Sequence, residues 1–197
     1  MVSVRSFLTS AVAIMAVPAM AAISPQGIID GLKTLTDQSQ KLQRPAQSIT
    51  IVNAPLIIIG QGPLPVIIQE LTQFVETGNA MIQQFEGTQP ITNPTDAAAV
   101  YNAFHDFARV HTAFLNIMIG KSGILTKVPF VGPPVAAVLR QVESIDDTIA
   151  IFLIDNIESK SQDLTTEANS LGQTMDLAIK RYEGLQLGKR ESKVFVA

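Results

Sequence analysis

Apolar residues recur along this chain at the spacing of an α-helix, and this pattern constrains the fold more than any other feature. Residues 67–85 carry apolar or small side chains at alternating steps of four and three, and residues 97–118, 135–152 and 164–182 follow the same rule. Since an α-helix turns once every 3.6 residues, each segment places one apolar stripe along a helix. No segment of comparable length alternates with period two, so we expect an all-α fold.

Proline and glycine separate these segments. Asn93-Pro94-Thr95-Asp96 offers a capping side chain, a proline in the first turn and an acid beside the positive helix end. Gly62-Pro63 and Gly132-Pro133-Pro134 stand before two other stripes, while a sparser stripe over 28–49 should be kinked or broken by Pro45. Long helices with short connections pack side by side. The sequence thus predicts a bundle of about five long amphipathic antiparallel helices.

The composition limits what else the chain can be. It has no cysteine, 47% hydrophobic and 16% charged residues, and a formal net charge of -3. Disulfides, thiol catalysis and cysteine-ligated metals are therefore excluded, and intrinsic disorder is not expected. Nucleic-acid binding needs a clustered basic face, which this balance does not favour. We expect no nucleic-acid partner.

The two ends of the chain lack the helical stripes of its centre and have sequence features of their own. Arg5, an apolar run over 7–17 and an Ala-x-Ala motif that ends at Ala21 are the three parts of a secretory signal peptide. We therefore expect a signal peptide at 1–21, a helical domain at 22–186 and a flexible tail at 187–197. The mature protein should be secreted and extracellular, without a transmembrane segment.

A search for catalytic patterns returns little. No Gly-x-Ser-x-Gly motif is present, and His105 and His111 are six residues apart, which does not give the i,i+4 metal pair of a helix. Gly120-Lys121-Ser122-Gly123 ends a helical stripe, so it is interpreted as a helix C-cap and not as a phosphate loop. The adjacent Asp146 and Asp147 are expected on a solvated helix face. We expect no catalytic residue, no metal site and no cofactor.

His111 stands out because it lies within an apolar stripe and is the only ionisable residue assigned to these stripes. It is either a hydrogen-bonded core histidine or the polar anchor of a ligand head group. Gly78 lies between Phe74 and Met81, so the interior is either tightly packed or open as a channel. Two apolar connections, 54–60 and 124–131, either cap the core or form an exposed patch.

The chain resembles the fungal hydrophobic surface-binding protein A family, which includes the cell-wall galactomannoproteins. The resemblance spans about residues 28–184 and rests on the cysteine-free five-helix pattern together with segments 28–32, 114–121, 135–139 and 164–166. It implies a secreted, non-catalytic helical bundle, often associated with the cell wall. Members coat hydrophobic surfaces, and related wall proteins bind fatty acids in an internal tunnel.

The resemblance and the stripes together predict a non-catalytic binder of fatty-acid-like lipids or hydrophobic surfaces, with Gly78 providing room for an acyl chain. The expected ligand-lining residues are Phe74, Gly78, Met81, Phe104, Phe107, His111, Met118, Ile149 and Phe152. The expected partners are fatty acids or other apolar ligands, hydrophobic surfaces and secreted hydrolases. The alternatives are a lipid or polyester hydrolase, or its accessory, and a purely structural or antigenic wall protein. The chain lacks the Ser/Thr-rich stalk of the mannoproteins, which favours release over covalent wall attachment.

Overall fold

The apolar stripes form five α-helices in the structure, a computed structural model that describes residues 22–125, 128 and 131–187. Two short 3-10 helices, η1 (Ala54–Ile59) and η2 (Glu158–Lys160), lie in the connections. Within the described residues there is no strand, so the all-α prediction is confirmed. The expected signal peptide and nearly all of the expected tail lie outside the described residues. The helices are α1 (Pro25–Gln47), α2 (Pro63–Ile82), α3 (Pro94–Leu125), α4 (Gly132–Asn156) and α5 (Ser161–Leu187).

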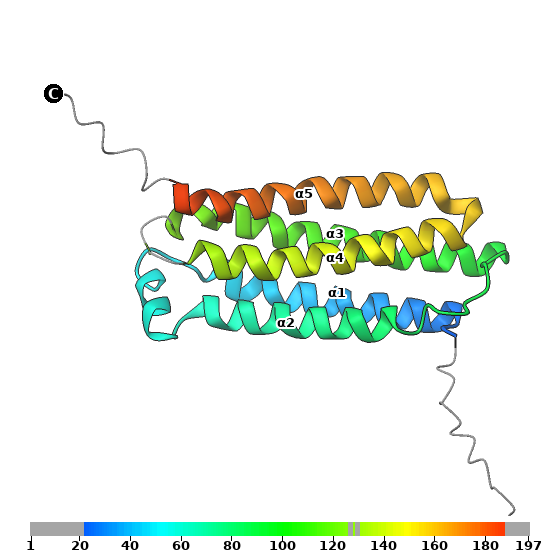
Figure 1. The fold of residues 1–197 in the computed structure, drawn as a ribbon, viewed down its shortest axis with the longest axis horizontal. Helices are drawn as coiled ribbons and strands as arrows, with labels where there is room; N and C mark the ends of the chain where they lie inside the picture. Colours follow the sequence, from blue (N-terminus) through cyan, green and yellow to red (C-terminus); the bar gives the residue numbers. More distant parts are fainter. Residues whose placement is uncertain (1–21, 126–127, 129–130, 188–197) are drawn as a thin grey trace, which may run out of the picture.

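The five helices close into a ring around one core. In order around the ring, α1 packs against α2, α2 against α4, α4 against α5, α5 against α3, and α3 against α1. Consecutive helices run in opposite directions, as expected (Figure 1). Ring order differs from chain order, however, so the neighbours α1 and α3, α3 and α5, and α2 and α4 run in the same direction. Among the described helices, none has the length and hydropathy that crossing a bilayer requires.

The helix ends agree with most of the local signals. The Asn93 side chain accepts hydrogen bonds from the backbone N–H groups of Thr95 and Asp96, at 2.8 and 3.3 Å, as the capping pattern predicts. Helix α1 ends at Gln47, two residues after Pro45. The C-cap expected at 120–123 is wrong, because α3 continues to Leu125. Here tertiary packing overrides the two glycines.

Lys121 gives that extended end of α3 a structural role. Its Nζ donates to the backbone carbonyls of Gln47 and Ile49, each at 2.8 Å. These carbonyls lie at and just beyond the end of α1, where helix carbonyls lack partners within the helix. The contact therefore joins the end of α3 to the start of the η1 connection, which leads from α1 to α2.

Aromatic side chains fill much of the core. Phe74, Phe104, Phe107, Phe114 and Tyr182 are fully buried. Burial of each stabilises the fold by roughly 1.5–3 kcal/mol on an area scale. The Tyr182 hydroxyl donates to the Met118 carbonyl at 2.9 Å, which fixes α5 on α3. This core is continuous through all five helices.

Gly78 brings α2 and α4 close together. A Cβ atom placed on Gly78 would lie 2.3 Å from Cγ2 of Ile145, a separation that real Cβ atoms do not show. The space expected beside Gly78 is therefore filled by Ile145. The glycine serves close helix packing in this structure, and the expectation that it provides an open gap is wrong.

We predict that Gly78→Ala lowers the free energy of unfolding by about 1–3 kcal/mol, because the added methyl group overpacks the contact with Ile145. Glycine to alanine within a helix ordinarily stabilises by up to about 1 kcal/mol. The matched control is Gly172→Ala in α5, where an added Cβ meets nothing within 4 Å. Urea denaturation measures the change in the free energy of unfolding, which should be a loss for Gly78→Ala and a gain for Gly172→Ala.

A second background checks the cause. In an Ile145→Ala chain, Gly78→Ala should destabilise much less, because the clashing side chain is gone. A gain in stability from Gly78→Ala similar to that from Gly172→Ala would contradict the close contact.

Candidate functional site: a buried polar trio

Three polar side chains meet in the apolar core. Ser39 on α1, His111 on α3 and Asp146 on α4 expose 0%, 0% and 6% of their surface. The Ser39 Oγ lies 2.8 Å from Nδ1 of His111, and Nε2 of His111 lies 3.6 Å from Oδ2 of Asp146. The trio therefore links three of the five helices through one imidazole ring.

The hydroxyl proton of Ser39 determines which nitrogen of the His111 ring carries the ring proton. Ser39 donates this proton to the Leu35 carbonyl at 2.8 Å. Since a serine has only one such proton, His111 Nδ1–H must donate to Ser39 Oγ, and Nε2 carries a lone pair. Nε2 and both carboxyl oxygens of Asp146 have no hydrogen-bond partner. Buried polar groups normally have one, so these atoms are open to a further donor or acceptor.

Aromatic rings surround the imidazole. The centroid of the His111 ring lies 5.1 Å from that of Phe74, 5.4 Å from that of Phe107 and 5.8 Å from that of Phe114. These rings shield the trio from water and lower the local dielectric constant. A hydrogen bond is stronger, and an unpaired charge more costly, in such surroundings.

Burial changes both acid–base equilibria. It lowers the pKa of His111 from 6.5 to about 3, because the charged imidazolium loses its hydration. Burial also raises the pKa of the Asp146 carboxyl well above 3.8, and the nearby charges of Asp147 and Glu143 raise it further. The pair therefore favours a neutral imidazole and a protonated carboxyl. Within the described residues, no group of three His, Cys, Asp or Glu could hold a metal ion.

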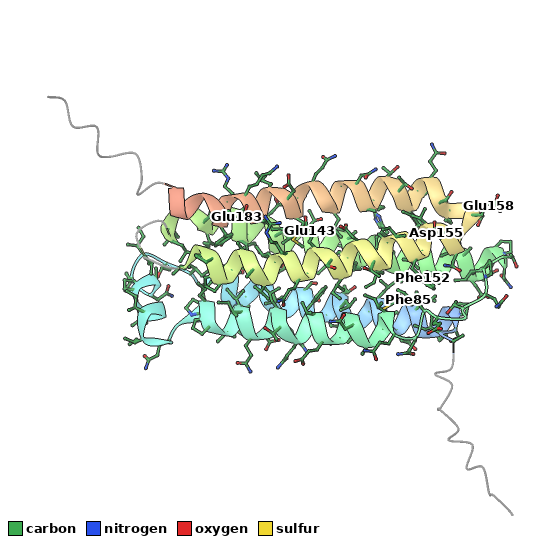
Figure 2. All side chains as sticks on the ribbon, in the orientation of Figure 1. Phe85, Glu143, Phe152, Asp155, Glu158 and Glu183 are labelled. Carbon is green, nitrogen blue, oxygen red and sulfur yellow. The ribbon has the colours of Figure 1, made fainter. Side chains whose placement is uncertain are left out.

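The structure buries eight of the nine expected ligand-lining residues. From Phe104 to Met118 they extend along α3 for 14 residues, or about 21 Å at 1.5 Å per residue. Phe152 differs: it is half-buried, and its ring stacks on Phe85 with 3.7 Å between centroids (Figure 2). The eight buried residues are Phe74, Gly78, Met81, Phe104, Phe107, His111, Met118 and Ile149.

Sequence reasoning missed two members of the trio. It took His111 as the only ionisable stripe residue and placed Asp146 on a solvated face, but Asp146 is buried beside His111. A signal was present, because Asp146 stands four residues after Val142 and three before Ile149. Ser39 has the same spacing from Leu35 and Leu42. A polar residue at a stripe position is what marked His111 as well.

The two apolar connections have different surroundings. The first lies at one end of the bundle (Figure 1), where Ile58 and Ile59 expose 66% and 65% of their surface and Val52, just before η1, exposes 87%. In the second, the described residues Val128 and Val131 are buried. The first connection thus presents an exposed apolar patch, while the described part of the second covers the core.

Solved structures share this fold. The first ligand-binding domain of the Penicillium marneffei MP1 protein, complexed with arachidonic acids, aligns with a TM-score of 0.68 and 13% identity over 81% of this chain and 99% of that domain. AFMP4P, in complex with palmitic acid, aligns with a TM-score of 0.65 and 17% identity over 82% and 99%. The second MP1 ligand-binding domain, also with arachidonic acids, gives 0.66 and 13% over 81% and 92%.

These comparisons show which proteins share the fold of this chain. The chain has the fold of helical ligand-binding domains, and the described neighbours are binding proteins. No protein-family model matches the chain, and no curated protein sequence matches it. The fold is therefore shared at a sequence identity of 13–17%.

The acid–base state of the trio predicts an unusual pH dependence of stability. In the folded chain, burial keeps His111 neutral down to about pH 3 and keeps the proton on Asp146 to a pH well above 3.8. In the unfolded chain, with pKa values of 6.5 and 3.8, they hold two protons below 3.8, one between these values and none above 6.5. Stability rises with pH where the unfolded state binds more protons. The contribution of His111 should thus fall as pH decreases below 6.5, that of Asp146 should fall as pH rises above 3.8, and the two oppose each other between these values.

Single substitutions should separate the contributions of His111 and Asp146 to the pH dependence of stability. Asp146→Asn leaves His111 alone, so stability should fall as pH decreases from 6.5 towards 3. His111→Leu leaves Asp146 alone, so stability should fall as pH rises above 3.8. Urea denaturation between pH 4 and 8 measures both, with the exposed His105→Leu as control. Variants with the pH profile of the parent chain would contradict the assignment.

Proposed function

We propose that this protein binds a fatty-acid-like lipid inside the helical ring, with the head group at His111. The observation that carries the proposal is the unpaired Nε2 of His111, held among aromatic rings in the middle of the core. The lone pair on Nε2 accepts a hydrogen bond from the O–H of a protonated carboxylic acid, so the head group binds without an unpaired buried charge. The fold likeness to domains solved with arachidonic or palmitic acid supports the same ligand class.

The acyl chain would follow the line of buried residues between α2, α3 and α4. This line is about 21 Å long between the levels of Phe104 and Met118. Ile145 now fills the space beside Gly78, so binding requires α2 and α4 to move apart. A ligand makes such a minor conformation dominant when it binds that conformation more tightly. Met81 and Met118, with their flexible side chains, can adapt to the chain at two levels of the core.

A binding role fits the trio better than hydrolysis does. Ser39, His111 and Asp146 have the composition of a hydrolytic triad. Ser39 Oγ, however, is buried and already donates to the Leu35 carbonyl, so an ester carbonyl cannot approach it in this arrangement. We therefore assign the trio to ligand recognition and fold specificity.

The η1 patch of Val52, Ile58 and Ile59 supports a second contact, with hydrophobic surfaces. Exposed apolar patches on soluble proteins commonly mark interaction sites. The same proposal includes secretion through the signal peptide at 1–21 and an extracellular, wall-associated location. The unpaired polar atoms in the core favour a ligand site over a purely structural wall protein.

We expect delipidated protein to bind a fluorescent long-chain fatty acid at one saturable site. His111→Leu should weaken this binding by about 1–3 kcal/mol, because the head group loses its partner while the volume of the site is kept. His105→Leu, on the exposed face of the same helix, should leave the affinity unchanged. Fluorescence titration gives the affinities, and circular dichroism checks that each variant is folded.

Two results would overturn the proposal. One is the absence of saturable fatty-acid binding by the parent chain, and the other is equal affinity in the two histidine variants. The same preparation should not turn over a chromogenic ester. Turnover that disappears in His111→Leu would favour the hydrolase alternative.

The η1 patch should control adsorption to apolar particles and not affinity for a soluble fatty acid. We expect Ile58→Ser to reduce adsorption to polystyrene or alkane droplets several-fold, because it removes exposed apolar surface. Ile58 is 66% exposed, so the change should leave the core intact. The matched control is Leu177→Ser on α5, where the leucine is 44% exposed. Depletion of the protein from solution is the measurement. Equal loss in the two variants would remove η1 from the proposal.

A further inference from the structure

A second candidate site lies on the outside of the ring, between α4 and α5. An open groove of about 420 Å³ runs along this seam, within the size range of small-molecule sites. Beside it, a cavity of about 10 Å³ reaches inward to Asp146. The two share Asp147, Ala150, Ala168 and Gly172, so the cavity forms the inner end of the groove.

Asp146 provides unpaired hydrogen-bonding oxygens at the inner end of the groove. Its side chain is 6% exposed, it lines the cavity, and neither carboxyl oxygen has a hydrogen-bond partner. A volume of about 10 Å³ holds one group the size of a water molecule. The inner end therefore fits a small group that donates hydrogen bonds.

The charge of the lining is of one sign. The ionisable residues that line the cavity and the groove are Glu143, Asp146, Asp147 and Asp176. Of the nearby cations, Lys180 pairs with Asp176 and balances that acid, whereas Arg140 pairs with Glu183, which does not line the groove or the cavity. Figure 2 shows Glu143 on α4 on the side of α5. The charges of Asp147 and Glu143 raise the pKa of Asp146 beyond the effect of burial.

The walls of the groove suit an alkyl chain. Ala150, Ile151, Ile154 and Ala168 line it, and Ile151 is 58% exposed. An added Cβ on Gly172 would meet nothing within 4 Å, so the α5 side is open. From Glu143 to Ile154 the seam measures about 16 Å along α4. The α4 wall is therefore mainly apolar, the α5 wall adds the polar side chains of Thr165, Asn169 and Gln173, and the inner end is acidic.

We propose that the α4–α5 groove binds a single-chain amphiphile with an ammonium head group. In the empty groove, burial favours the protonated carboxyl of Asp146, whereas a cation beside it favours the carboxylate. On binding, the Asp146 proton passes to solvent and the ammonium donates to the carboxylate near Glu143 and Asp147. The alkyl chain then covers Ala150, Ile151 and Ala168. An ammonium offers three donors and a positive charge, which match unpaired acceptors in an acidic site. A carboxylate head is repelled here, and a hydroxyl head leaves the acidic charges unbalanced. The groove lies outside the ring and meets the proposed fatty-acid site only at Asp146, which lies 3.6 Å from Nε2 of His111. Its charge preference is the opposite of that site's, and its evidence does not depend on that proposal.

Isothermal titration with three ligands of equal chain length tests the head group. Dodecylamine, dodecanol and dodecanoate are titrated below their aggregation concentrations into the full mature chain. We expect one site for dodecylamine with at least tenfold higher affinity than that of the other two at this groove. Dodecanol or dodecanoate binding as tightly as dodecylamine in the groove would overturn the proposal.

Three variants locate the binding. Asp146→Asn should lower the dodecylamine affinity at least tenfold, whereas Asp155→Asn, an exposed acid on the same helix outside the groove, should change it less than twofold (Figure 2). Gly172→Leu should fill the groove from α5 and abolish amine binding while Asp146 and the core stay intact. Unchanged amine affinity in Gly172→Leu, or equal losses in the two aspartate variants, would overturn the site. Fatty-acid titration of Gly172→Leu should match the parent, which separates the two proposals.

Discussion

Burial of five apolar helix faces in one closed ring is the interaction on which this protein depends. The chain has no cysteine, so no disulfide supports the fold. Stability must come from apolar area removed from water, at roughly 25 cal/mol per Å². The close approach of α2 and α4 at Gly78 shows how far this packing goes, since a single methyl group would not fit there. Solved structures share the fold at 13–17% identity, as expected when the hydrophobic pattern rather than particular side chains sets it.

The Ser39–His111–Asp146 trio is polar, whereas the core around it is apolar. An apolar core of the same shape would be at least as stable, because unpaired buried polar atoms oppose folding. The trio remains tolerable because His111 stays neutral and Asp146 favours its protonated form, so no unpaired charge is buried. Such departures from a consistent core are expected at functional sites. The same carboxyl group of Asp146 faces the imidazole on one side and the α4–α5 cavity on the other.

The sequence predicted the elements well because they depend on local information. Stripe spacing located the helices, and Asn93 with Pro94 marked the start of α3. The same stripes correctly placed Phe74, Phe104, Phe107 and His111 in the interior. Local signals failed where distant partners decide the outcome. The 120–123 segment stays helical while Lys121 bonds to carbonyls more than 70 residues away.

The sequence by itself therefore determined the all-α fold, the helices and the faces they bury, because helical period and hydrophobicity act within one segment. The tertiary structure decided which helices are neighbours, since ring order does not follow chain order. It alone brought Ser39 to His111 across 72 positions and turned Asp146 inward beside the imidazole. It also decided that Ile145 fills the space at Gly78 and that the η1 residues remain exposed. These outcomes follow from packing between segments, which no pattern within one segment specifies.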